Sequence, residues 1–85
     1  MAGASFHVLI TSPERVLVDS RAHSALFPGE RGEFEVLPLH RPLVSRLVAG
    51  MVVVDGQGLA IRRGVVRVAD DEVIAVIELR AGASS

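Results

Sequence analysis

Apolar and polar side chains alternate with a period of two in several short segments of the chain. In SFHVLI, Phe6, Val8 and Ile10 occupy every second position, which predicts a strand with one buried face. The segment EFEVLP alternates in the same way and ends at Pro38, which lacks the N–H that a strand ladder needs. Between them, RVLVDSRAHSALF is longer than a usual strand and changes phase near Asp19–Ser20. That change predicts a bulge or a strand that crosses from one sheet to another.

Two hairpins are predicted in the second half of the chain. The run MVVVDGQGLAIRR places DGQG between two apolar segments, which is a strong hairpin signal. The run GVVRVADDEVIAVIELR repeats the pattern around Asp70–Asp71. In PLVSRLVAG, Pro42 and Gly50 leave a segment too short to separate helix from strand by its period, and we favour a strand. Strands that recur every ~8–12 residues predict an all-β sandwich or barrel.

The composition predicts a single small domain. Of the 85 residues, 49% are hydrophobic and few are aromatic, so the core must consist of Val, Leu, Ile and Ala side chains. We expect one domain over residues 1–85, with an ordered core over about 5–80 between the polar ends MAGAS and RAGASS. The formal net charge of −1 argues against nucleic-acid partners. No run approaches the ~20 apolar residues of a membrane span, so direct lipid insertion is not expected.

Candidate catalytic and metal-binding residues do not form a recognised pattern. His7, His23 and His40, with Glu33 and Glu35, could be imagined as metal ligands of a small jelly roll, but no H-x-H pair is present. The chain has no Cys or Lys and no GxSxG motif, which argues against nucleophilic catalysis. We therefore predict no catalytic residue, no metal and no cofactor. A metal-binding jelly-roll enzyme and a free-standing interaction module remain as alternatives.

The segment GEFEVLPLHRPLV, residues 32–44, concentrates polar groups and prolines in an otherwise Val-rich chain. Glu33 and Glu35 lie on one face of a predicted strand about 6–7 Å apart, a spacing that suits either acid–base chemistry or a solvated edge. Pro38 and Pro42 restrict the loop before any partner binds, which lowers the entropy lost on binding. The residues alone thus favour a docking loop over a catalytic one.

The order of the motifs resembles a known family. The segments HVLITSPERVL, PGERGEFEVLPLHRPLVSRLVAGMVVV and RRGVVRVADDEVIAVIEL, which run in order from about His7 to Leu79, resemble the N-terminal domain of the epsilon subunit of F-type ATP synthase. Three glycines of the family pattern differ: Leu39 lies between proline and histidine, Glu35 follows the phenylalanine, and a Gly-Gly pair becomes Arg63–Gly64. The family's C-terminal pair of helices is absent from the chain.

The resemblance implies a fold and a set of partners. The implied fold is a ten-stranded β-sandwich of two antiparallel sheets that is not an enzyme in its own right. It would act as a rotor subunit in the central stalk of a proton- or sodium-translocating synthase, at the cytoplasmic face of the bacterial inner membrane, peripherally bound. Lacking the helical pair, it would couple ion flow to ATP synthesis without inhibiting hydrolysis.

The resemblance also assigns interface residues. The ring of c subunits would be contacted by Glu30, Arg31, Gly32 and Glu33, and the gamma subunit by Ser12, His40, Arg41, Pro42 and Ser45. A joint that carries torque needs an apolar centre, for which we expect Leu39, Leu43 and exposed aliphatic side chains of the Val-rich strands.

Overall fold

The computed structural model describes residues 4–81, which form eight β-strands and no helix. The outermost residues of the two polar ends, 1–3 and 82–85, lie outside the described residues. No helix that could cross a membrane occurs within 4–81. The strands are β1 (Phe6–Thr11), β2 (Val16–Ala22), β3 (Ala25–Gly29), β4 (Gly32–Val36), β5 (Leu43–Leu47), β6 (Gly50–Val54), β7 (Gln57–Ala69) and β8 (Glu72–Leu79).

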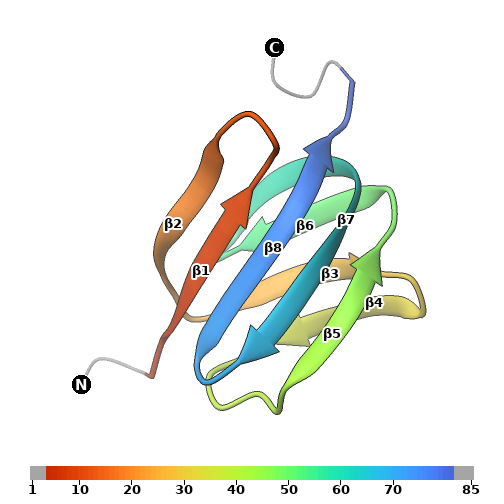
Figure 1. Cartoon of the computed structure of the whole chain (residues 1–85). Helices are drawn as coiled ribbons and strands as arrows, with labels where there is room; N and C mark the ends of the chain where they lie inside the picture. The colour runs from red at the N-terminus through yellow and green to blue at the C-terminus, as the bar shows by residue number, and fades with distance from the viewer. Residues whose placement is uncertain (1–3, 82–85) are drawn as a thin grey trace.

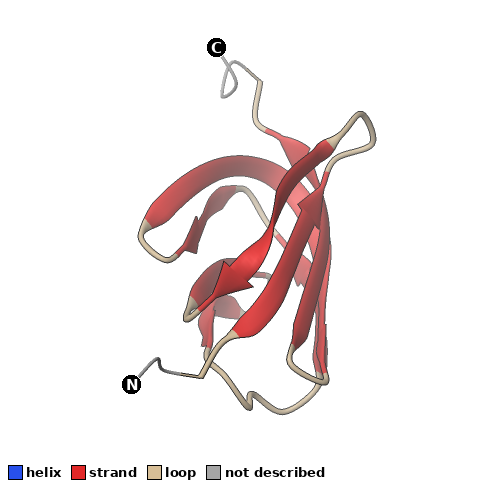
Figure 2. Ribbon diagram, turned by 90° about the vertical axis from the view of Figure 1, so that its left-hand side faces the viewer, coloured by secondary structure: helices blue, strands red, loops and turns tan. Residues whose placement is uncertain are grey.

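The strands form two packed layers joined by hydrogen bonds. Their order is β2-β1-β8-β7-β5-β3-β4, and β6 pairs with both β3 and β7. In Figure 1 the layer of β1, β8, the second half of β7 and β5 lies in front of β3 and β6. Figure 2 shows this layer from the side, with the remaining strands curling away from it. The all-β sandwich class expected from the sequence is therefore confirmed.

The details of the sheet differ from the expected ten strands in two antiparallel sheets. The described residues contain eight strands in one continuous hydrogen-bonded sheet, because β7 is 13 residues long and runs through both layers. It pairs with β6 over its first part and with β5 and β8 over its second, and its register with β8 shifts between Ile61 and Arg63. One pair is parallel rather than antiparallel: β1 and β8 lie side by side and run in the same direction.

Alternation along the strands builds the core. Phe6, Val8 and Ile10 of β1 are buried as the period of two predicted. Gly64 of β7 allows close approach to β8, because an added Cβ would lie 2.6 Å from the Val76 carbonyl oxygen. The buried apolar side chains are Phe6, Val8, Ile10, Ala22, Ala25, Phe27, Val36, Leu47, Val52, Ile61, Val66, Val68, Val73, Ala75 and Ile77.

Both predicted hairpins are confirmed. Asp55 and Gly56 connect β6 to β7 with φ values of 46° and 84°. Asp70 and Asp71 connect β7 to β8 with φ values of 53° and 59°. Two consecutive positive φ values match the twist of the flanking strands, and Asp tolerates this conformation better than most residues that have a side chain. The segment PLVSRLVAG contains strand β5, as we favoured.

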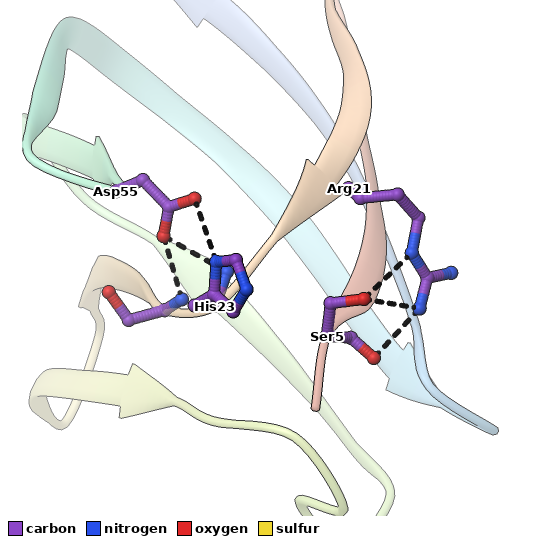
Figure 3. Close-up of polar contacts among 5 residues, drawn as sticks. Ser5, Arg21, His23 and Asp55 are labelled. Atoms are coloured by element: carbon purple, nitrogen blue, oxygen red, sulfur yellow. Dashed lines mark hydrogen bonds and ion pairs between the residues drawn. The ribbon is translucent and has the colours of Figure 1, made fainter. Parts of the chain in front are cut away.

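The long segment RVLVDSRAHSALF crosses between layers, one of the two predicted outcomes. The break comes at His23–Ser24, between β2 and β3, rather than at Asp19–Ser20. The Asp55 carboxylate holds this corner, because its Oδ1 accepts the backbone N–H groups of His23 and Ser24, each at 3.0 Å (Figure 3). These two hydrogen bonds lower the pKa of Asp55 from its ordinary value.

Candidate functional site

The outward side of the front layer carries more apolar surface than a solvated sheet face needs. Val44, Val65 and Val76 expose 71%, 48% and 51% of their surface. They lie close together on neighbouring strands. Val65 of β7 pairs with Val76 of β8. On its other side, β7 pairs with β5, where Arg46 lies opposite Val65 and Val44 lies opposite Arg67. We call the outward side of β1, β5, β7 and β8 the outer face. The name is kept for one part of that side, formed by Leu9, Thr11, Val44, Arg46, Val65, Arg67, Ile74 and Val76.

Arginines border the apolar centre of the outer face. Arg46 and Arg67 are exposed, and neither belongs to a salt bridge within residues 4–81. Arg63 is paired with Glu78 at 3.2 Å at the margin. A hollow lies at this margin, lined by Pro13, Val48, Val65, Val76, Arg46 and Arg63 among others. An apolar centre with an arginine rim is the arrangement typical of protein–protein interfaces.

The four residues assigned to the c ring lie together in the turn between β3 and β4 and in the first two positions of β4. Glu30, Arg31, Gly32 and Glu33 are all exposed, and Gly32 has a φ of 126°. The N–H of Glu30 donates to the Arg46 carbonyl oxygen at 2.9 Å, which ties this turn to the end of β5. The turn is therefore accessible to a partner and is held by the sheet.

Ser45 lies beside this turn rather than with the other residues assigned to gamma. It lines one hollow together with Glu30, Gly32 and Glu33. Its hydroxyl donates to the Arg46 carbonyl oxygen at 2.9 Å. A partner that reaches Ser45 would thus meet the acidic turn as well.

His40, Arg41 and Pro42 lie in the loop that connects β4 to β5. His40 is half-buried, and its Nδ1 donates to the Arg41 carbonyl oxygen at 2.6 Å. Arg41 and Pro42 are exposed. The histidine side chain therefore shapes its own loop, while the next two residues are available for contact.

Ser12 lies in the turn between β1 and β2, where its side chain is only 6% exposed. Its hydroxyl oxygen accepts the N–H groups of Glu14 and Arg15 at 3.3 and 3.2 Å. The side chain thus holds the turn. The exposed neighbour Pro13 lines the hollow at the margin of the outer face.

The outer face was only partly predictable from the sequence. The expected exposed aliphatic side chains of the Val-rich strands are present, and Leu39 is 84% exposed. Leu43, expected at the apolar centre, is instead half-buried and packs against the core. The signal for the outer face was the run VIAVI in β8, since a strand apolar on both sides requires cover on both sides.

The histidines considered as metal ligands lie apart. His7 is on β1, His23 is at the corner beside Asp55, and His40 is in the β4–β5 loop. Glu33 and Glu35 are exposed on β4. Over residues 4–81, no group of three or more His, Cys, Asp or Glu side chains is arranged to hold a metal ion.

His7 lies between two carboxylates on the outward side of the front layer. Its Nε2 is 2.6 Å from Asp19 on β2, and its Nδ1 is 3.3 Å from Glu72 on β8. The hydrogen bond to Asp19, followed by that to Glu72, raises the pKa of His7 above 6.5. Arg21 on β2 lies opposite His7 on β1, and its guanidinium donates hydrogen bonds to the carbonyl and hydroxyl oxygens of Ser5 (Figure 3).

The raised pKa predicts a pH dependence of stability. The protonated imidazole stabilises the fold fully below the unfolded-state pKa of 6.5, and this contribution is lost as pH rises through the higher folded-state pKa. We expect Asp19→Asn to bring the His7 pKa back toward 6.5, measured by NMR titration of the imidazole. Glu35→Gln, which changes a carboxylate elsewhere, should leave it unaltered. An unchanged His7 pKa in Asp19→Asn would show that the contact with Asp19 does not set it.

Comparison with known proteins identifies relatives of the whole sandwich. Residues 5–79 match the family described as the ATP synthase, Delta/Epsilon chain, beta-sandwich domain. The ATP synthase epsilon chain of Campylobacter fetus subsp. fetus is 37% identical over 79 residues, which cover 87% of this chain and 61% of the relative. That of Nitratiruptor sp. is 36% identical over 74 residues, or 81% of this chain and 57% of the relative. The chain thus spans about three fifths of the length of these relatives.

Two solved structures share the fold. A chain from the Euglena gracilis mitochondrial ATP synthase, OSCP/F1/c-ring in rotational state 1, superposes with a TM-score of 0.79 at 22% identity. The match covers 88% of this chain and 51% of that one. A chain from the Tetrahymena thermophila mitochondrial ATP synthase central stalk and c ring gives a TM-score of 0.74 at 10% identity, covering 85% and 62%.

Proposed function

The chain belongs to the family of the ATP synthase delta/epsilon chain β-sandwich domain, and we propose that it acts as a non-catalytic subunit of the central stalk of an F-type ATP synthase. In this role it docks on the gamma subunit and on the ring of c subunits, so that these parts turn as one body and ion flow is coupled to ATP synthesis. The assembly holds it peripherally at the cytoplasmic face of the bacterial inner membrane. The observation that carries the proposal is the apolar outer face.

The apolar side chains of the outer face do not contribute to the core of the sandwich. The core already lies between the two layers, and Val44, Val65 and Val76 point away from it into solvent. Contiguous exposed apolar side chains on a small domain mark an interaction site. The gamma subunit is the proposed occupant, because a joint that transmits torque needs desolvated apolar contact at its centre and charged contacts at its rim. Arg46 and Arg67 supply that rim.

The turn of Glu30 to Glu33 is the proposed contact with the c ring. Its chemistry differs from that of the outer face, since it is polar, exposed and charged. Contacts of this kind contribute to orientation and association rate more than to affinity. The anchoring hydrogen bond from Glu30 to Arg46 keeps the turn in place before binding. In this proposal, the apolar outer face supplies most of the affinity for gamma. The polar turn fixes the orientation of the domain on the c ring.

Binding titrations against the purified gamma subunit and against gamma assembled with its c ring, all from one source, test the proposal. We expect Glu33→Arg to reduce, by about two- to tenfold, the gain in affinity that the ring adds to gamma. In the proposal, the change replaces attraction between Glu33 and a cationic group of the ring by repulsion. Binding to gamma alone should not change. Glu14→Arg reverses another exposed glutamate, in a different turn, and should leave the ring contribution unaltered. Failure of the wild-type chain to bind gamma at micromolar concentration would reject the proposed function.

A further inference from the structure

We propose that Leu39 is an anchor residue that enters an apolar pocket of the gamma subunit; this inference rests on the proposed function. Leu39 is the most exposed of the large apolar side chains in the described part of the chain, with 84% of its surface accessible. It lies at the tip of the β4–β5 loop, which contains His40, Arg41 and Pro42. Its backbone conformation, its exposure and its position carry the inference.

The tip of this loop is a β-turn that ordinarily requires glycine. The His40 N–H donates to the Leu37 carbonyl oxygen at 3.1 Å, closing a four-residue turn. Pro38 occupies the second position, and Leu39 occupies the third with a φ of 66°. A turn with proline second and a positive φ third is of type II, in which the third residue is usually Gly or Asn. A leucine at this place is strained, because its Cβ crowds the backbone.

Within residues 4–81, side-chain packing against the core does not offset that strain. The Leu39 side chain is not among the residues that pack against the core, and its neighbour Leu37 is itself 49% exposed. The backbone, by contrast, is held: the Leu39 N–H donates to the Asp71 carboxylate in the β7–β8 turn at 3.3 Å. The chain thus fixes the position of an apolar side chain that it does not bury. Strained backbone conformations cluster at functional sites such as ligand clamps, which motivates a role for this side chain outside the fold.

The position of the loop places Leu39 beside the surface proposed to bind gamma. The loop leads directly into β5, whose second residue, Val44, belongs to the outer face. A partner that covers Val44 therefore extends naturally onto Leu39. The acidic turn of Glu30 to Glu33 borders the same strand two residues further along, where Glu30 bonds to Arg46. An uncharged leucine held on a turn fixed by proline suits a preformed apolar pocket, since little freedom is lost when it binds.

The test compares binding and stability in the same variants of the full chain. Leu39→Gly and Leu39→Asn both accept the positive φ and remove the aliphatic side chain, so the thermal midpoint should not fall. Affinity for gamma should fall about tenfold or more, as expected for the loss of a buried leucine. Leu39→Met keeps the apolar contact and should stay within a few-fold of wild type. A structural role alone would not separate binding from stability in this way.

The outcomes distinguish this inference from the proposed function. Wild-type binding that persists unchanged in Leu39→Gly and Leu39→Asn overturns the role of Leu39 and leaves the proposed function in place. Absence of wild-type binding rejects the proposed function itself. A dimer of this chain, seen by sedimentation and abolished by Leu39→Gly while gamma binding is unaffected, would assign Leu39 to self-association and also overturn the inference.

Discussion

Replacing Val65 by glutamate and Val76 by arginine together is expected to weaken binding to the gamma subunit by more than a hundredfold. The two valines face each other across β7 and β8 and form the centre of the outer face. Burying each valine in an interface contributes about 1.5 kcal/mol or more, and each unmatched charge placed there adds a desolvation cost. Since about 1.4 kcal/mol is tenfold in affinity, the combined effect exceeds two orders of magnitude. Titration of the double variant against gamma measures it.

This pair of substitutions is designed to leave the fold intact. Opposite charges directly across an antiparallel pair attract each other, so the strands should remain paired. The control is Ser20→Arg with Gln57→Glu, which introduces the same two charged side chains at exposed positions of β2 and β7, outside the outer face. The control should bind gamma like wild type. Equal affinity of both double variants would mean that gamma does not cover the outer face.

Phe27→Ala is expected to destabilise the domain by about 3–5 kcal/mol, the usual range for removing a buried aromatic ring. Phe27 is fully buried on β3, and its ring stacks on that of Phe34 with centroids 5.7 Å apart. A domain of this size has a total stability of only about 4–13 kcal/mol, so this change removes a large share of it. Urea unfolding followed by circular dichroism gives the value.

A surface substitution provides the scale for that measurement. Val44→Ala, at a position 71% exposed on the outer face, should change the free energy of unfolding by no more than about 0.5 kcal/mol. If the two alanine variants unfold at similar urea concentrations, the Phe27 ring does not contribute to stability as its full burial indicates.

Local chemistry made much of the fold predictable. The alternation around Phe6, Val8 and Ile10 identified β1, and the Asp-Gly and Asp-Asp turns located both hairpins. These signals act over a few neighbouring residues, so they can be read from the chain directly. The number of strands could not be read in this way, because whether β7 counts as one strand or two depends on how it bends through both layers.

Long-range contacts account for what the sequence did not indicate. Asp55 was recognisable as a turn residue, but nothing near it shows that its carboxylate holds the corner at His23, 32 positions away. The same holds for Ser45, which the fold places in one hollow with Glu33. The positive φ of Leu39 was not predicted, since a non-glycine residue at that place gives no signal of its own.

The most direct test of whether gamma covers the outer face is protection of single cysteines from a thiol reagent. The chain contains no cysteine, so Val76→Cys and Gln57→Cys each introduce one reactive group, the first on the outer face and the second at the β6–β7 turn. Labelling rates are compared with and without saturating gamma subunit. We expect gamma to slow labelling strongly at position 76 and to leave position 57 unaffected. Full reactivity at position 76 in the gamma complex would show that gamma does not cover the outer face.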